Sequence, residues 1–284
     1  MKRILIPLTL ILMLPALACS FTVNLPNIKS TTGPTRTVSI DETVPATDQP
    51  ARVILKMGAG TFTLAPGGES LISGTIRYNV PEWRPVTSNV NNTVTIREET
   101  TNRFTIPNNV VNDWNLKLSP NQLMDLSVEA GAYQGNMNLS GLKLADLSIS
   151  DGASQTEVHF NSPNPVTMQR LTYKTGASQV KLYGLAYANF QHMTFDSGAG
   201  SYTLDFTGAL KSDASVDIRS GVSEVTIIVP NGMSARVYNQ GGISSVDTQG
   251  AWTSAGNSYS TQGSGPALTI NVEMGVGSLK LRQP

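Results

Sequence analysis

Short runs of alternating apolar and polar residues fill the chain from Arg36 onward, and Gly, Pro and Asn separate these runs. Successive side chains of a strand point to opposite faces, so this alternation is typical of strands with one buried face. No stretch of the region shows the 3.6-residue period of an amphipathic helix. The pattern therefore predicts an all-β protein.

The strands repeat in register around one glycine. Apolar residues lie five and three residues before this glycine and, in most copies, four and six residues after it. The aligned glycines are Gly58, Gly131, Gly152, Gly176, Gly198, Gly221 and Gly275. From Gly131 to Gly221 they recur every 21 to 24 residues. Each unit therefore reads as a strand, a glycine turn and a second strand, where glycine allows a positive φ or a close backbone approach.

A unit of two short strands cannot bury its apolar face alone, whereas stacked units share a continuous core. We therefore predict a right-handed β-solenoid with rungs of about 21–24 residues, in which aligned positions form vertical columns. One such column would contain Val128, Ile149, Tyr173, Phe195 and Ile218. A meander of hairpins folded into a sandwich is the alternative, because it also gives short strands at regular spacing. A sandwich does not require a fixed register between copies, so the solenoid is favoured.

The N-terminal residues indicate export. A basic start, Met1-Lys2-Arg3, precedes an apolar run that is too short to span the ~30 Å core of a bilayer, which is the pattern of a signal peptide. The segment Ala16-Leu17-Ala18-Cys19 is similar to the lipobox of bacterial lipoproteins. Cys19 is the only cysteine and has no disulfide partner. We expect cleavage of residues 1–18 and acylation of Cys19, with ordinary cleavage after Ala18 as the alternative.

The mature chain divides by composition and spacing. Residues 19–35 predict a flexible tether, 36–115 a smaller N-terminal β subdomain, and 116–284 the solenoid repeat domain. After Gly242 the spacing breaks, and the chain ends one unit later, at Gly275. The inserted residues, 247–266, hold Trp252 and Tyr259 among small polar residues, as in many recognition loops. The alternative is that the insert covers the open end of the core, as terminal repeats must.

The sequence offers little chemistry. Charged residues make up 14%, the formal net charge is zero, and no Lys/Arg cluster suggests a nucleic-acid partner. The two histidines, His159 and His192, fall in different phases of the repeat, and no third His or other Cys could complete a metal site. A G-x-S-x-G nucleophile elbow is also missing. We therefore expect no catalytic residue, no metal and no cofactor.

One column of charges needs a separate interpretation. Two residues before the aligned glycine the sequence has Glu129, Ser150, Lys174, Asp196 and Arg219. Alternating signs on stacked rungs are expected to form a surface ladder of ion pairs, because like charges directly opposite each other are unfavourable. The alternative is an acidic catalytic cluster, such as β-helical polysaccharide lyases and glycosidases carry.

The repeats resemble the toast-rack family of bacterial envelope proteins, which includes the C-terminal domain of LiaF-like cell-wall-stress proteins. The matching segments include RVILKMGAGTFTL, MTFDSGAGSYTLDFTGAL and MGVGSLKL, and the resemblance runs from about Thr37 to Leu281. It implies the family fold and supplies no catalytic residues. LiaF-like proteins carry membrane helices and act on a signalling partner, whereas this sequence has no second apolar stretch of that length.

These observations predict a non-catalytic, lipid-anchored protein of the cell envelope, held on the extracytoplasmic face of a membrane. Its β-solenoid surface would serve adhesion, sensing or assembly, with an envelope protein or a cell-wall glycan as partner. The alternative is a carbohydrate-binding or polysaccharide-cleaving β-helix. In that case Trp83, Trp114, Trp252 and Tyr259 would be exposed and would stack on sugar rings.

Overall fold

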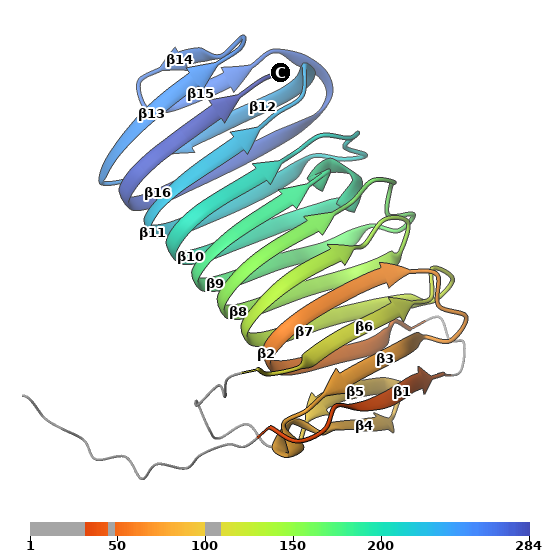
Figure 1. The fold of residues 1–284 in the computed structure, drawn as a ribbon. Helices are drawn as coiled ribbons and strands as arrows, with labels where there is room; N and C mark the ends of the chain where they lie inside the picture. The colour runs from red at the N-terminus through yellow and green to blue at the C-terminus, as the bar shows by residue number, and fades with distance from the viewer. Residues whose placement is uncertain (1–31, 45–48, 100–108) are drawn as a thin grey trace, which may run out of the picture.

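The computed structural model describes residues 32–44, 49–99 and 109–284. Cys19 lies outside these residues, so its acylation stays a prediction. The described part of the chain contains a single sheet of 16 strands, wound into a stack of bent rungs (Figure 1). Two short 3-10 helices complete it, η1 (Pro81–Trp83) and η2 (Leu185–Ala188). No helix in these ranges is both long and apolar enough to cross a membrane.

Seven long strands form the body of the stack, and neighbours along it pair in parallel. They are β2 (Ala51–Pro66), β7 (Leu123–Asn138), β8 (Lys143–His159), β9 (Met168–Tyr183), β10 (Phe190–Asp205), β11 (Ala214–Ile228) and β16 (Gly263–Arg282). Each strand continues through its aligned glycine, so the expected turn is a bend within one strand. The structure thus has one bent strand per rung where the sequence suggested two.

Close packing between rungs explains the aligned glycines. A Cβ atom added to Gly176 would lie 2.4 Å from the carbonyl oxygen of Gly152 on the rung before. The same contact recurs along the stack, and these aligned glycines do not have a positive φ. Of the two roles considered for this position, the close backbone approach is therefore the one that the fold uses.

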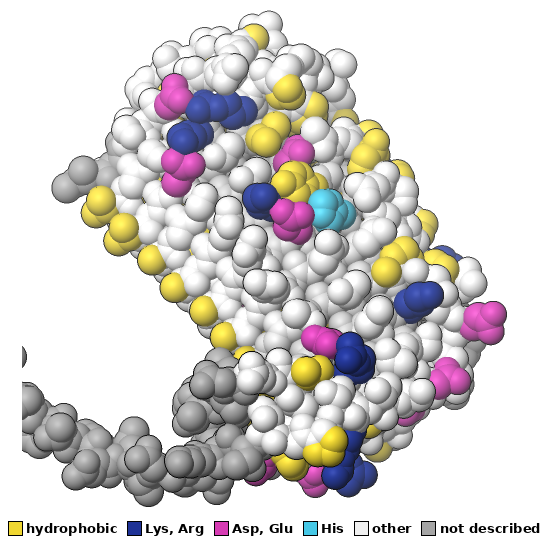
Figure 2. Space-filling model, in the orientation of Figure 1, with side chains coloured by type: hydrophobic (Ala, Val, Ile, Leu, Met, Phe, Trp, Pro, Cys, Tyr) yellow, Lys and Arg dark blue, Asp and Glu magenta, His cyan; other side chains and the backbone are white. Residues whose placement is uncertain are grey.

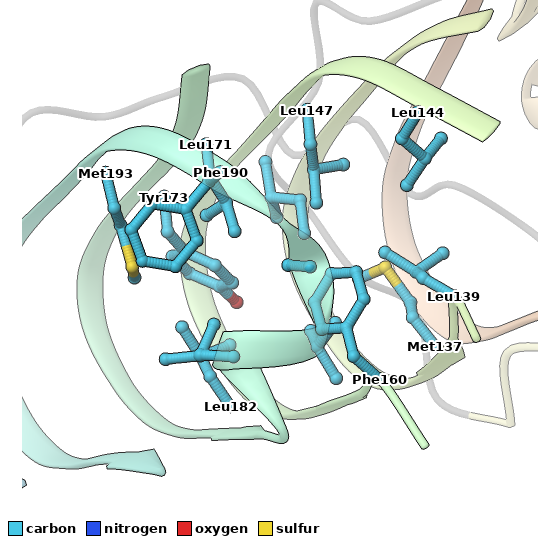
Figure 3. Close-up of a cluster of buried hydrophobic side chains, with 14 of the residues drawn as sticks. Met137, Leu139, Leu144, Leu147, Phe160, Leu171, Tyr173, Leu182, Phe190 and Met193 are labelled. Atoms are coloured by element: carbon cyan, nitrogen blue, oxygen red, sulfur yellow. The ribbon is translucent and has the colours of Figure 1, made fainter. Parts of the chain in front are cut away.

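The predicted apolar column is confirmed. Val128 pairs with Ile149, Ile149 with Tyr173, Tyr173 with Phe195, and Phe195 with Ile218. All five side chains are buried, and the rings of Tyr173 and Phe195 pack with centroids 5.6 Å apart. Figure 3 shows Tyr173 among Leu147, Leu171, Met193 and other apolar side chains in the space between the two arms of the rungs. A parallel stack in fixed register excludes the sandwich.

The region assigned to an N-terminal subdomain closes the first end of the same sheet. Besides β2, it contains β1 (Arg36–Glu42), β3 (Ile72–Tyr78), β4 (Pro85–Val90), β5 (Thr93–Glu98) and β6 (Asn112–Leu118). β5 pairs with the first arm of β2, and β6 pairs with the second arm. β2 itself stacks on β7. The expected boundary after residue 115 falls inside β6.

At the opposite end of the stack, the order of the strands in space differs from their order in the sequence. The final strand, β16, lies between β11 and the pair formed by β12 (Gly232–Asn239) and β13 (Ile243–Gln249). The unit around Gly275 is therefore the second-to-last rung, although it is the last in sequence. The inserted residues include a hairpin of β14 (Thr253–Ala255) and β15 (Ser258–Thr261), and β15 pairs with the free edge of β12. Through the insert the chain crosses the end of the stack, so that β16 takes its place between β11 and β12.

Candidate functional site

The outer faces of the rungs carry the predicted charge ladder. Register places Asp196 beside Lys174 on one side and Arg219 on the other. Asp196 and Arg219 form an ion pair at 3.3 Å, and Lys56 pairs with Glu129 at 2.9 Å in the same column. The four paired side chains are at least one-third exposed, so each pair contributes little to stability. The column is a surface ladder, which favours the structural interpretation over an acidic cluster.

The bend of the stack presents a row of small apolar side chains. From Gly152 onward, the residue after each aligned glycine points outward there, and Figure 2 shows this row as a straight line along one edge. Its members include Ala153, Ala177, Ala199, Val222 and Val276. Val222 is 62% exposed and Val276 is 49% exposed. Charged side chains on the face in view form small separated clusters.

Two of the aromatic residues expected to meet sugar rings are buried. Trp83 is 9% exposed and Trp114 only 1%. Trp114 fills the core next to Phe62 and donates a hydrogen bond from Nε1 to Asn112 Oδ1 at 3.1 Å. Their prediction as exposed aromatics is wrong, because Trp114 points into the core and Trp83, on η1, packs in a second small cluster of buried residues. Trp252 and Tyr259 are partly buried and pack against the core at its end.

The two histidines lie on different arms. His192 is on β10, where Nδ1 lies 2.9 Å from Ser215 Oγ and Nε2 lies 3.5 Å from Asp217 Oδ2. His159 ends β8 on the other arm. Across residues 32–44, 49–99 and 109–284 no three His, Cys, Asp or Glu side chains come together in a way that could hold a metal ion.

A groove of about 420 Å³ lies where the second arms of three neighbouring rungs end. It is lined by side chains of β8, by the segment after β9 that includes η2, and by the end of β10. The lining residues are Glu157, His159, Phe160, Asn161, Tyr183, Gly184, Tyr187, Asp205 and Thr207. It is open to solvent along one side, so a ligand could enter without any movement of the chain.

The aromatic wall of this groove is held in place by the fold. His159 pairs with Tyr183 in the strand register, and their rings stack with centroids 4.9 Å apart and planes 15° apart. Tyr187 lies on η2, where its N–H donates to the carbonyl of Gly184 at 2.9 Å. Gly208 approaches the ring of Tyr187 so closely that an added Cβ would lie 2.9 Å from it. Both tyrosine rings are therefore fixed before any ligand binds.

Two carboxylates flank the aromatic wall. Glu157 accepts a hydrogen bond from Lys181 Nζ at 3.0 Å, which raises the pKa of Lys181. The other oxygen of Glu157 lies 3.6 Å from His159 Nε2. Asp205 Oδ1 accepts the backbone N–H of Thr207 at 2.8 Å. Each carboxylate keeps lone pairs for further hydrogen bonds, since an ionised carboxylate offers about four acceptor positions.

The tyrosines with raised pKa lie inside the stack and not in the groove. Asp151 is buried at the bend and accepts hydrogen bonds from Tyr173 at 2.8 Å, Tyr133 at 3.4 Å and Thr175. Burial is the main cause that raises the pKa of Tyr173 and of Tyr133, and the charge of Asp151 adds to it. These hydroxyls satisfy a buried carboxylate, so the shifts report a structural network.

Sequence reasoning missed the groove but contained one signal for it. His159 and Tyr183 occupy the same position, seven residues after the aligned glycines Gly152 and Gly176. An alignment of that column predicts that the two rings are neighbours. Tyr187 could not have been added, because it lies in a loop outside the repeat.

Comparison with known proteins agrees with the fold. The chain matches the family described as the N-terminal domain of toast_rack, DUF2154, over residues 28–183 and again over 164–228. A search of curated proteins found no significant match. A crystal structure of a proposed cell adhesion protein from Clostridium sporogenes is 20% identical, with a TM-score of 0.52, over 88% of this chain and 100% of that chain.

A second crystal structure, of a proposed adhesin from Bacteroides fragilis, is 15% identical with a TM-score of 0.48, over 87% of this chain and 97% of that chain. Likeness at these identities concerns the fold alone. The family match spans more than half of the sequence and includes the N-terminal strands together with the central rungs. The chain therefore belongs to the toast-rack family.

Proposed function

We propose that this protein is a non-catalytic, lipid-anchored protein of the cell envelope that uses its β-solenoid surface for adhesion. The observation that carries the proposal is the form of that surface. Seven bent strands display two long outer faces in one register, while the core between them is closed. Such a surface offers many repeated, weak contacts, which suits attachment to a repetitive partner.

The polar ladders favour a role in recognition over a catalytic role. Gln134, Gln155 and Gln179 are register neighbours on three successive rungs, so their amides form a repeated array. The ion pairs on the outer faces join neighbouring rungs in the same way. Repeats on a rigid scaffold commonly serve as extended binding surfaces. In the groove, both carboxylates are held by Lys181 or by backbone, which favours binding over polysaccharide cleavage.

The proposed anchor would orient the stack relative to the membrane. Acylation at Cys19 would tie the β1 end to the membrane through residues 19–35, the predicted tether. Stable anchoring of this kind takes more than one acyl chain. The end formed by β12 to β15 would then point away from the membrane, together with the hairpin that carries Tyr259.

The comparisons add a reason for adhesion among the functions that an envelope solenoid could have. The C. sporogenes protein with the same fold is described as a proposed cell adhesion protein. Because one fold hosts many functions, this likeness suggests the role and does not establish it. The proposed location in the envelope is supported by the family match and by the predicted signal peptide and lipobox-like segment.

Deletion of the protein from its host tests the proposal. Deleted cells should attach less well than wild-type cells to surfaces coated with purified envelope glycans or with whole neighbouring cells, and the full chain supplied in trans should restore attachment. Fractionation of the complemented strain should place the chain with the membranes. Unchanged attachment after deletion on every surface tested would contradict the adhesion role.

A further inference from the structure

We propose that the groove between His159, Tyr183 and Tyr187 is a binding site for a neutral sugar ring of a glycan. The inference rests on the proposed function and names the ligand class and the site. It depends on three features of the groove: two fixed aromatic rings, two flanking carboxylates and a volume of about 420 Å³. None of these is part of the charge ladder or of the apolar row at the bend.

The aromatic rings give the site its selectivity for a pyranose. The C–H bonds on one face of a sugar ring carry partial positive charge, and the face of an aromatic ring carries partial negative charge. Tyr183 is fixed by its stack on His159, and Tyr187 is fixed by Gly208. A ring that is already ordered loses little conformational entropy when a ligand binds.

The hydroxyl groups of these tyrosines are available to a ligand. Neither Tyr183 nor Tyr187 hydrogen-bonds through its phenol oxygen to another residue in the described part of the chain. Each phenol can both donate and accept. They therefore supply polar contacts at the edge of the surface on which the sugar would stack.

The carboxylates determine which glycans fit. Glu157 lies on β8 and Asp205 on β10, so one carboxylate stands on each side of Tyr183, which ends β9. Carboxylate oxygens accept hydrogen bonds from the hydroxyl groups of a sugar. Lys181 balances the charge of Glu157, so repulsion of a uronic acid carboxylate or a phosphate group comes from Asp205. The site should therefore favour neutral hexoses and N-acetylhexosamines over acidic sugars.

The size of the groove determines how strongly we expect a glycan to bind. A volume of about 420 Å³ is near the lower end of small-molecule sites. It accommodates one or two sugar rings, and its open side lets a longer glycan continue past it. Single-site affinity should be weak, and attachment of a cell would come from many copies acting together.

Ligand-observed NMR on the purified full-length mature chain in detergent tests the site. The probes are three neutral tetrasaccharides, cellotetraose, chitotetraose and mannotetraose, together with the acidic tetragalacturonate. Tyr183→Ala and Tyr187→Ala remove the stacking rings. Tyr238→Ala is the matched control, because Tyr238 is a partly buried tyrosine on β12, outside the groove. Tyr183→Phe keeps the ring and removes the hydroxyl, so it separates the contribution of stacking from that of the phenol hydroxyl.

We expect at least one neutral probe to bind and tetragalacturonate to bind more weakly. Tyr183→Ala should weaken that binding by about tenfold or more, whereas Tyr238→Ala and Tyr183→Phe should change it by less than about threefold. Absence of binding by all three neutral probes would overturn the inference, as would equal binding by Tyr183→Ala or preference for tetragalacturonate. Reduced attachment of deleted cells would then still support adhesion through another surface.

Discussion

The carboxylate of Glu98 packs against Gly58 in the same way that the carbonyl oxygen of Gly58 packs against Gly131, the aligned glycine of the next rung. A Cβ added to Gly58 would lie 2.8 Å from Glu98 Oε2, and one added to Gly131 would lie 2.5 Å from the carbonyl oxygen of Gly58. β5 ends at Glu98 and β6 begins at Asn112, so neither strand continues under the bend of β2. Glu98 instead accepts hydrogen bonds from the Gly58 backbone and from Asn112 Nδ2, the latter at 2.7 Å. One side chain thus completes the first end of the stack.

Loss of this side chain should destabilise the protein. Glu98→Ala would leave the N–H of Gly58 and one of the two N–H groups of Asn112 Nδ2 without an acceptor in a buried site, because the carbonyl of Ala59 accepts the other. The cost is about 1–3 kcal/mol for an unsatisfied group. Urea denaturation followed by circular dichroism would measure this as a lower free energy of unfolding. Glu129→Ala is the control, because the ion pair of Glu129 with Lys56 is exposed. An equal and small effect of both substitutions would show that Glu98 does not complete the bend.

Glu98 should also make stability depend on pH. Burial raises its pKa above its ordinary value of 4.5, so the folded protein binds a proton more tightly than the unfolded chain does. The contribution of Glu98 to stability is therefore greatest below pH 4.5, and it is lost as the pH rises through the raised pKa. Because burial also raises the pKa of Asp125, the comparison of wild type with Glu98→Gln isolates the contribution of Glu98. The melting temperature of the variant should fall less between pH 4 and pH 7, and parallel curves would contradict the assignment.

The buried column should be far more sensitive than the surface ladder. Phe195 is fully buried between Tyr173 and Ile218, so Phe195→Ala should cost about 3–5 kcal/mol. Asp196→Lys changes a partly exposed neighbour in the same strand and should cost about 1 kcal/mol or less. Both values come from the same denaturation experiment. A cost of several kcal/mol at Asp196 would mean that the ladder is not a surface feature.

Trp252 distinguishes the two interpretations of the inserted residues. Its side chain packs against the core at the end of the stack, and its Nε1 is buried. We expect Trp252→Ala to lower the melting temperature by about 3 °C or more, since 1 kcal/mol corresponds to roughly 2–4 °C in a domain of 150–250 residues. Val90→Ala, at a residue 59% exposed, is the control. A melting temperature within about one degree of wild type would instead indicate an exposed contact residue.

The sequence predicted the features that depend on period and register. Alternation with a period of two and one aligned glycine were enough to place Tyr173 beside Phe195 and Asp196 beside Arg219. The position of β16 could not be predicted, because repeats show which segments are rungs and not their order in space. The groove was missed for a related reason: Tyr187 lies on a loop that no repeat describes, although Asp205 shares the repeat position of His159 and Tyr183. Glu98 was also outside the pattern, because the bend that it completes lies at the end of the stack.

Attachment of whole cells that produce either the wild-type chain or Cys19→Ser tests the central claim most directly. Both strains would be matched for total protein and compared with deleted cells on a glycan-coated surface. We predict that wild-type chain stays with the membranes and restores attachment, whereas Cys19→Ser is lost from the membrane fraction and attaches no better than deleted cells. Full attachment and unchanged membrane association of the Cys19→Ser strain would contradict a lipid-anchored adhesion protein.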